Sequence, residues 1–217
     1  MNVRREDMLR YLGSAGLTPD ERLTARMDEA VAETLAASSP RHVYRRLPLT
    51  DSLPLSGNDV REALDGCREV VFFAFTLGTG PEEREARAFA RGDSLGAALI
   101  DAAASCLIES YCDEVCEQIA KDENVTLTLR YSCGYGDWDL GRQADVLRLL
   151  DAQRRIGLHV SAGGVMVPQK SVTAVAGIRA EGYSPAARSS HTADKCARCA
   201  ALSCPYRKAP ASYGKEE

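Results

Sequence analysis

Three features are missing from this 217-residue sequence, and each absence excludes a class of protein. It has no basic excess, since 27 Lys and Arg face 31 Asp and Glu for a net charge of −4, which argues against nucleic acid as a partner. No apolar run approaches the length of a membrane span, the longest being Val70 to Leu77. The start, MNVRREDMLR, lacks the apolar core of a signal peptide. We therefore expect a cytoplasmic protein without a membrane segment.

Cysteines, in contrast, are numerous. Eight cysteines without an export signal argue against a disulfide framework and point to free thiols, metal binding or redox chemistry. Cys112 and Cys116 stand one helical turn apart and could hold a metal, but they belong to a segment otherwise suited to packing. We expect that pair to be core residues, together with Cys67 and Cys106, because a buried free cysteine behaves as a small hydrophobe.

Three of the other cysteines cluster near the end of the chain as C-x2-C-x4-C, formed by Cys196, Cys199 and Cys204. Thiolates at this spacing can converge on one ion, which predicts a zinc site or an iron–sulfur cluster. Either would need a fourth ligand, for which His191 and Cys133 are the candidates. The alternative is a flexible tail with incidental thiols. The spacing does not decide between zinc and a cluster.

Composition changes to Gly, Ser, Pro and Ala near residue 180. We therefore predict one folded domain over residues 1–180, with an N-terminal helical extension, followed by a linker and cysteine-rich tail over 181–217.

Within that domain the apolar run Glu69 to Leu77 predicts a strand buried in the middle of a sheet. The longest predicted helix runs from Asp93 to about Lys121, an edge strand is expected within residues 42–54, and a further strand over residues 171–178. A G-x-G turn follows the buried strand, but Glu83 replaces the third glycine of a dinucleotide-binding motif, so such a site is not favoured.

The richest stretch is Val125 to Gly141, in which an alternating strand leads to a turn with two glycines. Alternation places Val125, Leu127, Leu129 and Tyr131 on one face and Arg130 on the other. An Arg fork followed by glycine backbone is suited to a carboxylate ligand. The alternative is a surface turn with a solvated Arg. A helix over residues 140–150 is expected next, capped by Asp137 or Asp139.

Arg130, Gly134 and Tyr135 match an R-x-x-x-G-Y signature, and the sequence resembles the activation (reactivation) domain of cobalamin-dependent methionine synthase. The likeness continues through Ile156-Gly157-Leu158, Val165 to Pro168 and Ser171 to Ala174. It is specific over residues 125–178, plausible over 93–120 and weak before that. Cys133 inside the signature and Lys170 after the M-x-P turn depart from the usual pattern, and the cysteine tail is not part of the usual domain.

The resemblance implies an α+β fold, in which a bent antiparallel sheet packs with long helices, and a bound S-adenosylmethionine. Arg130 would hold the ligand carboxylate, Gly134 would leave room for main-chain contacts, and Tyr135 would face the corrinoid as the candidate catalytic residue. Glu109 and Asp113 are candidates for the family's acidic contacts. Cys133 is a further candidate at the ligand site, where the tail could fold back, complete a metal site and pass an electron inward.

The function implied is reductive remethylation of cob(II)alamin carried by a corrinoid-binding methionine synthase subunit, with flavodoxin or ferredoxin as electron donor. The chain would then be a component of a methyltransferase. Three alternatives remain: reactivation of another corrinoid methyltransferase, a non-catalytic assembly module for the corrinoid protein, and a metal-tail scaffold unrelated to S-adenosylmethionine.

Overall fold

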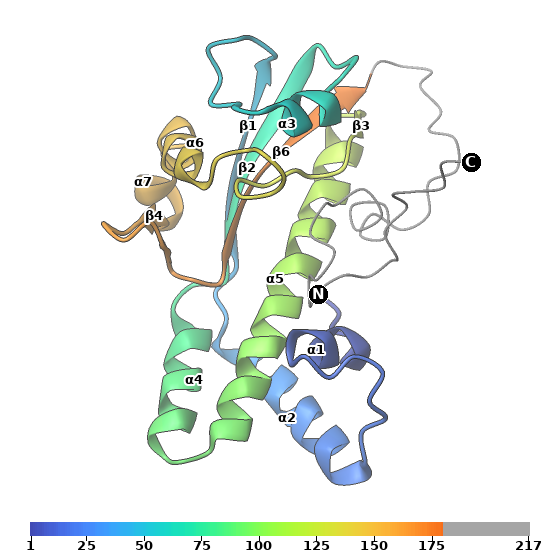
Figure 1. The fold of residues 1–217 in the computed structure, drawn as a ribbon, viewed down its shortest axis with the longest axis vertical. Coiled ribbons are helices and arrows are strands. Elements are labelled where there is room, and N and C mark those ends of the chain that lie inside the picture. The colour runs from blue at the N-terminus through green and yellow to red at the C-terminus, as the bar shows by residue number, and fades with distance from the viewer. Residues whose placement is uncertain (180–217) are drawn as a thin grey trace, which may run out of the picture.

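In the computed structural model, which describes residues 1–179, a four-stranded antiparallel sheet lies between helices on both faces (Figure 1). The strand order is β1 (Arg41–Pro48), β2 (Glu69–Thr76), β6 (Ser171–Arg179) and β3 (Thr126–Leu127). A separate small sheet pairs β4 (His159–Val160) with β5 (Met166–Val167). The predicted α+β class is confirmed.

The helices divide into three groups (Figure 1). One sheet face is covered by α3 (Asn58–Ala63), α6 (Gln143–Leu149) and α7 (Ala152–Ile156), and the other by α5 (Ser94–Asp122). Beyond the sheet, α1 (Arg5–Tyr11), α2 (Glu21–Ala37) and α4 (Gly80–Ala90) pack around the first half of α5. A short 3-10 helix, Leu140–Arg142, precedes α6.

The central strand β2 follows from its sequence, because an uninterrupted apolar run can fill both faces of a sheet. Phe72 packs into the cluster beneath α3, α6 and α7, whereas Phe73 and Phe75 pack against α5. All three are fully buried. The predicted buried strand, the edge strand within residues 42–54 and the strand from Ser171 are therefore confirmed.

The long helix α5 begins as predicted, with the Asp93 side chain accepting a hydrogen bond from the Gly96 amide at 2.9 Å. At 29 residues it is about 43 Å long, so it connects the helical end of the molecule to the sheet. By length and composition α5 is apolar enough to cross a membrane, which the sequence expectation missed. Its most apolar window is 56% buried inside the fold, and this packing accounts for its composition.

The helix expected over residues 140–150 is confirmed, because the 3-10 helix Leu140–Arg142 and α6 together cover residues 140–149. Its start is capped by Asp139, one of the two expected residues, which accepts a hydrogen bond from the Gly141 amide at 2.9 Å. A separate helix, α7, begins after Asp151, whose φ of 52° is left-handed. Asp137 has a different role, described below.

Candidate functional site

Arg130 lies between two carboxylates on the exposed face of α5. Its Nη1 donates to Asp113 Oδ1 at 2.7 Å and its Nη2 to Glu109 Oε2 at 3.1 Å. The Arg130 side chain is only 12% exposed, whereas those of Glu109 and Asp113 are 48% and 60% exposed. The solvated Arg of the alternative interpretation is therefore not what the structure contains. The three residues suggested separately by the sequence form one charged group.

Arg130 reaches α5 because the segment after β3, which continues along β6 to the Tyr131 bridge, is irregular. The Thr128 hydroxyl accepts a hydrogen bond from the Gly177 amide at 2.8 Å, a position that a main-chain carbonyl would hold in a regular ladder. Leu127 consequently packs on the α5 side of the sheet, while Tyr131 packs on the opposite side. The predicted alternation, with Leu127 and Tyr131 on one face, is wrong, because a local irregularity in a strand reverses the faces of the residues after it.

The turn after Arg130 is held by its own main chain. The Gly134 amide donates to Trp138 O at 2.8 Å, and the Trp138 amide donates to Tyr135 O at 3.1 Å. Gly134 has a φ of 86°, which favours glycine, and an added Cβ would lie 3.1 Å from Leu140 Cδ1. Tyr135 is 55% exposed, so its ring is accessible from solvent, as contact with a partner would require.

Asp137 fastens this turn to α3, 78 residues earlier in the chain. Its carboxylate accepts hydrogen bonds from the Asn58 amide at 2.6 Å and the Asp59 amide at 3.0 Å. These two bonds hold the Asp137 pKa below its usual range. Asp59 returns a bond by accepting from the Asp137 amide at 3.2 Å. Asp137 therefore caps α3 and not the helix that follows it, which sequence spacing could not indicate.

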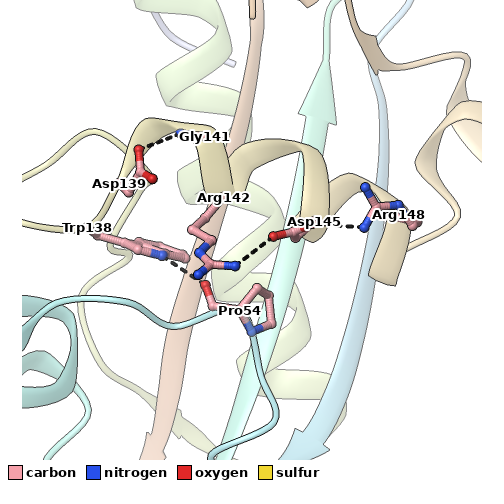
Figure 2. A network of polar contacts seen from close by, with 7 residues as sticks. All are labelled: Pro54, Trp138, Asp139, Gly141, Arg142, Asp145 and Arg148. Carbon is pink, nitrogen blue, oxygen red and sulfur yellow. Dashed lines mark hydrogen bonds and ion pairs between the residues drawn. The ribbon is translucent and has the colours of Figure 1, made fainter.

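Trp138 anchors the other end of the turn (Figure 2). It is 1% exposed, its Nε1 donates to Pro54 O at 3.0 Å, and its ring stacks on Tyr131 with centroids 6.3 Å apart. Beside it, the segment 51–55 and the 3-10 helix with α6 border an open groove of about 550 Å³. Arg142 and Arg148 in this groove both pair with Asp145, at 3.1 and 2.8 Å (Figure 2). Among the described residues that line the groove, each cationic side chain is already paired with a carboxylate, so the groove is not a ready anion site.

Cys133 sits in the core cluster beneath α6. It is 8% exposed, and burial raises the pKa of its thiol to about 11. The side chain is therefore neutral near pH 7 and packs as a small hydrophobe. The expectation that Cys133 lies at the ligand site stays a prediction.

Cys112 and Cys116 lie on α5, next to the Arg130 side chain that packs against this helix. Cys112 is fully buried, and burial raises its pKa well above the ordinary value. Cys116 Sγ lies 3.9 Å from Arg130 Nη1. Within residues 1–179 no group of three or more His, Cys, Asp or Glu side chains is arranged to hold a metal ion. The predicted metal ligands Cys196, Cys199 and Cys204 and the boundary at residue 180 lie outside the described residues.

Lys170 is the residue whose contacts sequence reasoning missed. Its Nζ donates to Asp101 Oδ1 at 2.5 Å and to Ser105 Oγ at 2.9 Å, and its side chain is 15% exposed. The available signal was the spacing of Asp101 and Ser105, which lie two turns and one turn, respectively, before Glu109 on the same helix.

With this geometry in hand, the fold defines the protein as one built like a methionine synthase reactivation domain. A crystal structure of the MetH reactivation domain bound to AdoHcy superposes with a TM-score of 0.64, covering 84% of this chain and 76% of that one. The two sequences are 15% identical, so the likeness is one of fold. No family model matches the sequence. No curated protein matches it either.

Proposed function

We propose that this protein binds S-adenosylmethionine at Arg130, Glu109 and Asp113 and serves as the reactivation component of a cobalamin-dependent methionine synthase. The observation that carries the proposal is the pairing of one buried guanidinium with two half-exposed carboxylates. An amino-acid group presents a carboxylate and an ammonium side by side, and this arrangement offers a partner of opposite charge to each. The fold it shares with a reactivation domain bound to AdoHcy supports the same ligand class.

The donors of Arg130 leave room for such a ligand. A guanidinium has five N–H donors. Asp113 and Glu109 take one each, and within residues 1–179 neither Nε nor the second N–H of Nη2 has another hydrogen-bond acceptor. These donors can hold a ligand carboxylate without breaking the existing ion pairs, which keep the guanidinium in place.

The charge balance of the site favours a cationic ligand. One guanidinium and two carboxylates give a local charge of +1 − 2 = −1. S-adenosylmethionine adds a sulfonium to its zwitterionic amino-acid group and is therefore positive overall, whereas S-adenosylhomocysteine is neutral. Coulombic attraction should favour the sulfonium, and added salt should reduce that preference.

S-adenosylmethionine would supply the methyl group, which a corrinoid on the partner subunit accepts together with one electron from a flavodoxin or ferredoxin. The residues of this chain bind and orient. Arg130 fixes the amino-acid end, the Gly134 turn keeps the main chain close, and Tyr135 presents an exposed ring towards the partner.

The proposal is tested by methyl transfer. The protein is incubated with S-adenosylmethionine labelled in its methyl group, a corrinoid-binding methionine synthase subunit in the cob(II)alamin state, and reduced flavodoxin. Label should appear in methylcobalamin with the wild type and fall at least tenfold with Arg130→Ala. Tyr135→Ala should slow the transfer while leaving ligand affinity within twofold. Transfer that is unaffected by Arg130→Ala, or equal in the absence of the protein, would overturn the proposal.

A further inference from the structure

Two cations pair with the same face of α5. Arg130 lies at one end of this face and Lys170 at the other. The partners on the helix recur every four residues and therefore lie in one row: Asp101, Ser105, Glu109 and Asp113. We name this row the α5 stripe.

The spacing along the stripe is that of an extended ligand. The midpoint of the Arg130 partners is residue 111 and that of the Lys170 partners is residue 103, a difference of eight residues. At 1.5 Å per residue the two charged groups are about 12 Å apart. This separation is comparable to the length of an amino-acid chain linked through sulfur to a ribose.

The Lys170 ammonium is not needed to hold its own loop. Main-chain and carboxylate contacts already do this: the Gln169 and Lys170 amides donate to the Glu82 carboxylate, and Lys170 O accepts from the Leu77 amide at 3.0 Å. The Ser171 hydroxyl donates to Pro168 O at 2.7 Å. The contacts that the Lys170 side chain makes with α5 can therefore have a role other than holding this loop.

The group that Lys170 forms with Asp101 can bind a diol. Lys170 has three N–H donors, two of which go to Asp101 Oδ1 and Ser105 Oγ. Within the described chain the third donor has no acceptor and Asp101 Oδ2 has no donor, although the Asp101 side chain is 48% exposed. Ser105 is satisfied, because its hydroxyl also donates to Asp101 O at 2.9 Å. A neighbouring donor and acceptor match a pair of ribose hydroxyls, which both donate and accept.

We propose that Asp101 and Lys170 bind the ribose hydroxyls of the ligand whose amino-acid end is held at Arg130. This inference rests on the proposed function, since the ligand is the one assigned there. It makes Asp101 and Lys170 specificity-determining residues for the nucleoside end, and it gives a role to the lysine by which this sequence departs from the reactivation-domain pattern.

The test compares two probes by calorimetry on the full chain: S-adenosylhomocysteine and its 3′-deoxyadenosyl analogue. The wild type should prefer the complete ribose by roughly tenfold to hundredfold, the effect of one hydrogen bond to a charged group. Asp101→Asn and Lys170→Met should each reduce that preference to less than threefold. Asp122→Asn, at the far end of α5, is the matched control and should keep the wild-type preference.

A purely structural contribution of either residue would weaken both probes equally and leave their ratio unchanged. A wild type that binds both probes equally, or variants that keep the preference, would overturn the inference while the proposed function stands. A wild type that binds neither probe, with the corrinoid-binding subunit present, would overturn the proposed function itself. Circular dichroism establishes that each variant is folded, and the two variants remove opposite members of the pair.

Discussion

Trp138 provides the most direct test of how the turn next to Arg130 is held in place. It is the only tryptophan in the chain, is 1% exposed and donates its indole N–H to Pro54 O at 3.0 Å. Trp138→Phe keeps an aromatic ring but removes that donor. The main-chain bonds of Trp138 within the turn are retained, so the change isolates the side chain.

The expected loss has two parts. Leaving the partly buried Pro54 carbonyl without its indole donor costs about 1–3 kcal/mol. The smaller ring leaves a void between Tyr131 and the core, which costs about 1 kcal/mol more. A loss of about 2–4 kcal/mol in a domain of this size lowers Tm by roughly 5–15 °C.

The assay is thermal unfolding followed by far-UV circular dichroism, because the variant has no tryptophan fluorescence. Phe89→Leu is the control, since Phe89 is 68% exposed and its replacement should change the free energy of unfolding by less than about 0.5 kcal/mol. A Trp138→Phe variant that melts within 2 °C of the wild type would refute the argument that the indole hydrogen bond anchors the turn.

Three other predictions concern single residues. Gly136→Ala should lower the free energy of unfolding in urea by about 1–3 kcal/mol, because the φ of Gly136 is +51° and an added Cβ would lie 2.0 Å from Asp59 Oδ2. The control Gly13→Ala also has a positive φ but no atom within 4 Å of the added Cβ, so its loss of stability should be smaller. Equal losses in the two variants would contradict the predicted clash at Gly136. Burial lowers the folded-state pKa of His42, so the stability contributed by its neutral ring is present above roughly pH 6.5 and is lost as pH falls. The His42→Gln variant should therefore show a smaller drop in Tm between about pH 7 and pH 5.5 than the wild type. A drop equal to that of the wild type would contradict this role of His42. Cys133, with its pKa raised to about 11 by burial, should resist iodoacetamide in the native protein and react in urea, as measured by peptide mass spectrometry; rapid native labelling would show that it is not a core residue.

The parts of the fold that could be predicted are those determined by local sequence. The apolar run of β2 is long enough for a strand and has no polar face. Both of its faces are therefore buried only if the strand lies in the middle of a sheet. Helix α5 is capped by Asp93, begins at Ser94 and continues without Gly or Pro after Gly96. Each of these signals lies within the element it specifies.

The contacts that could not be predicted depend on residues distant in sequence. Asp137 caps a helix 78 residues earlier, which no spacing rule covers. The face of Arg130 is determined by the Thr128 hydroxyl, which accepts the Gly177 amide in place of a regular ladder bond. Alternation assumes a regular ladder and therefore placed Tyr131 on the wrong side of the sheet.

The candidate site could be predicted from the sequence only in part. Residue types identified Arg130 as an anion-binding side chain, and the family resemblance suggested Glu109 and Asp113 as acidic contacts of the ligand. That the three form one group follows only from the packing of β3 and the turn against α5. Lys170 pairs with α5 in the same way, through a loop placed by the sheet.

The proposed function depends on Arg130 holding the amino-acid end of S-adenosylmethionine, and calorimetric titration of that ligand tests this role most directly. Arg130→Ala should weaken binding by about 1.5–3 kcal/mol, or roughly tenfold to hundredfold. Arg46→Ala is the matched control, because Arg46 also pairs with two carboxylates, those of Glu69 and Glu123, and should leave the affinity within twofold. Equal affinities for the wild type and Arg130→Ala, or no binding by the wild type in the presence of the corrinoid-binding subunit, would contradict the account.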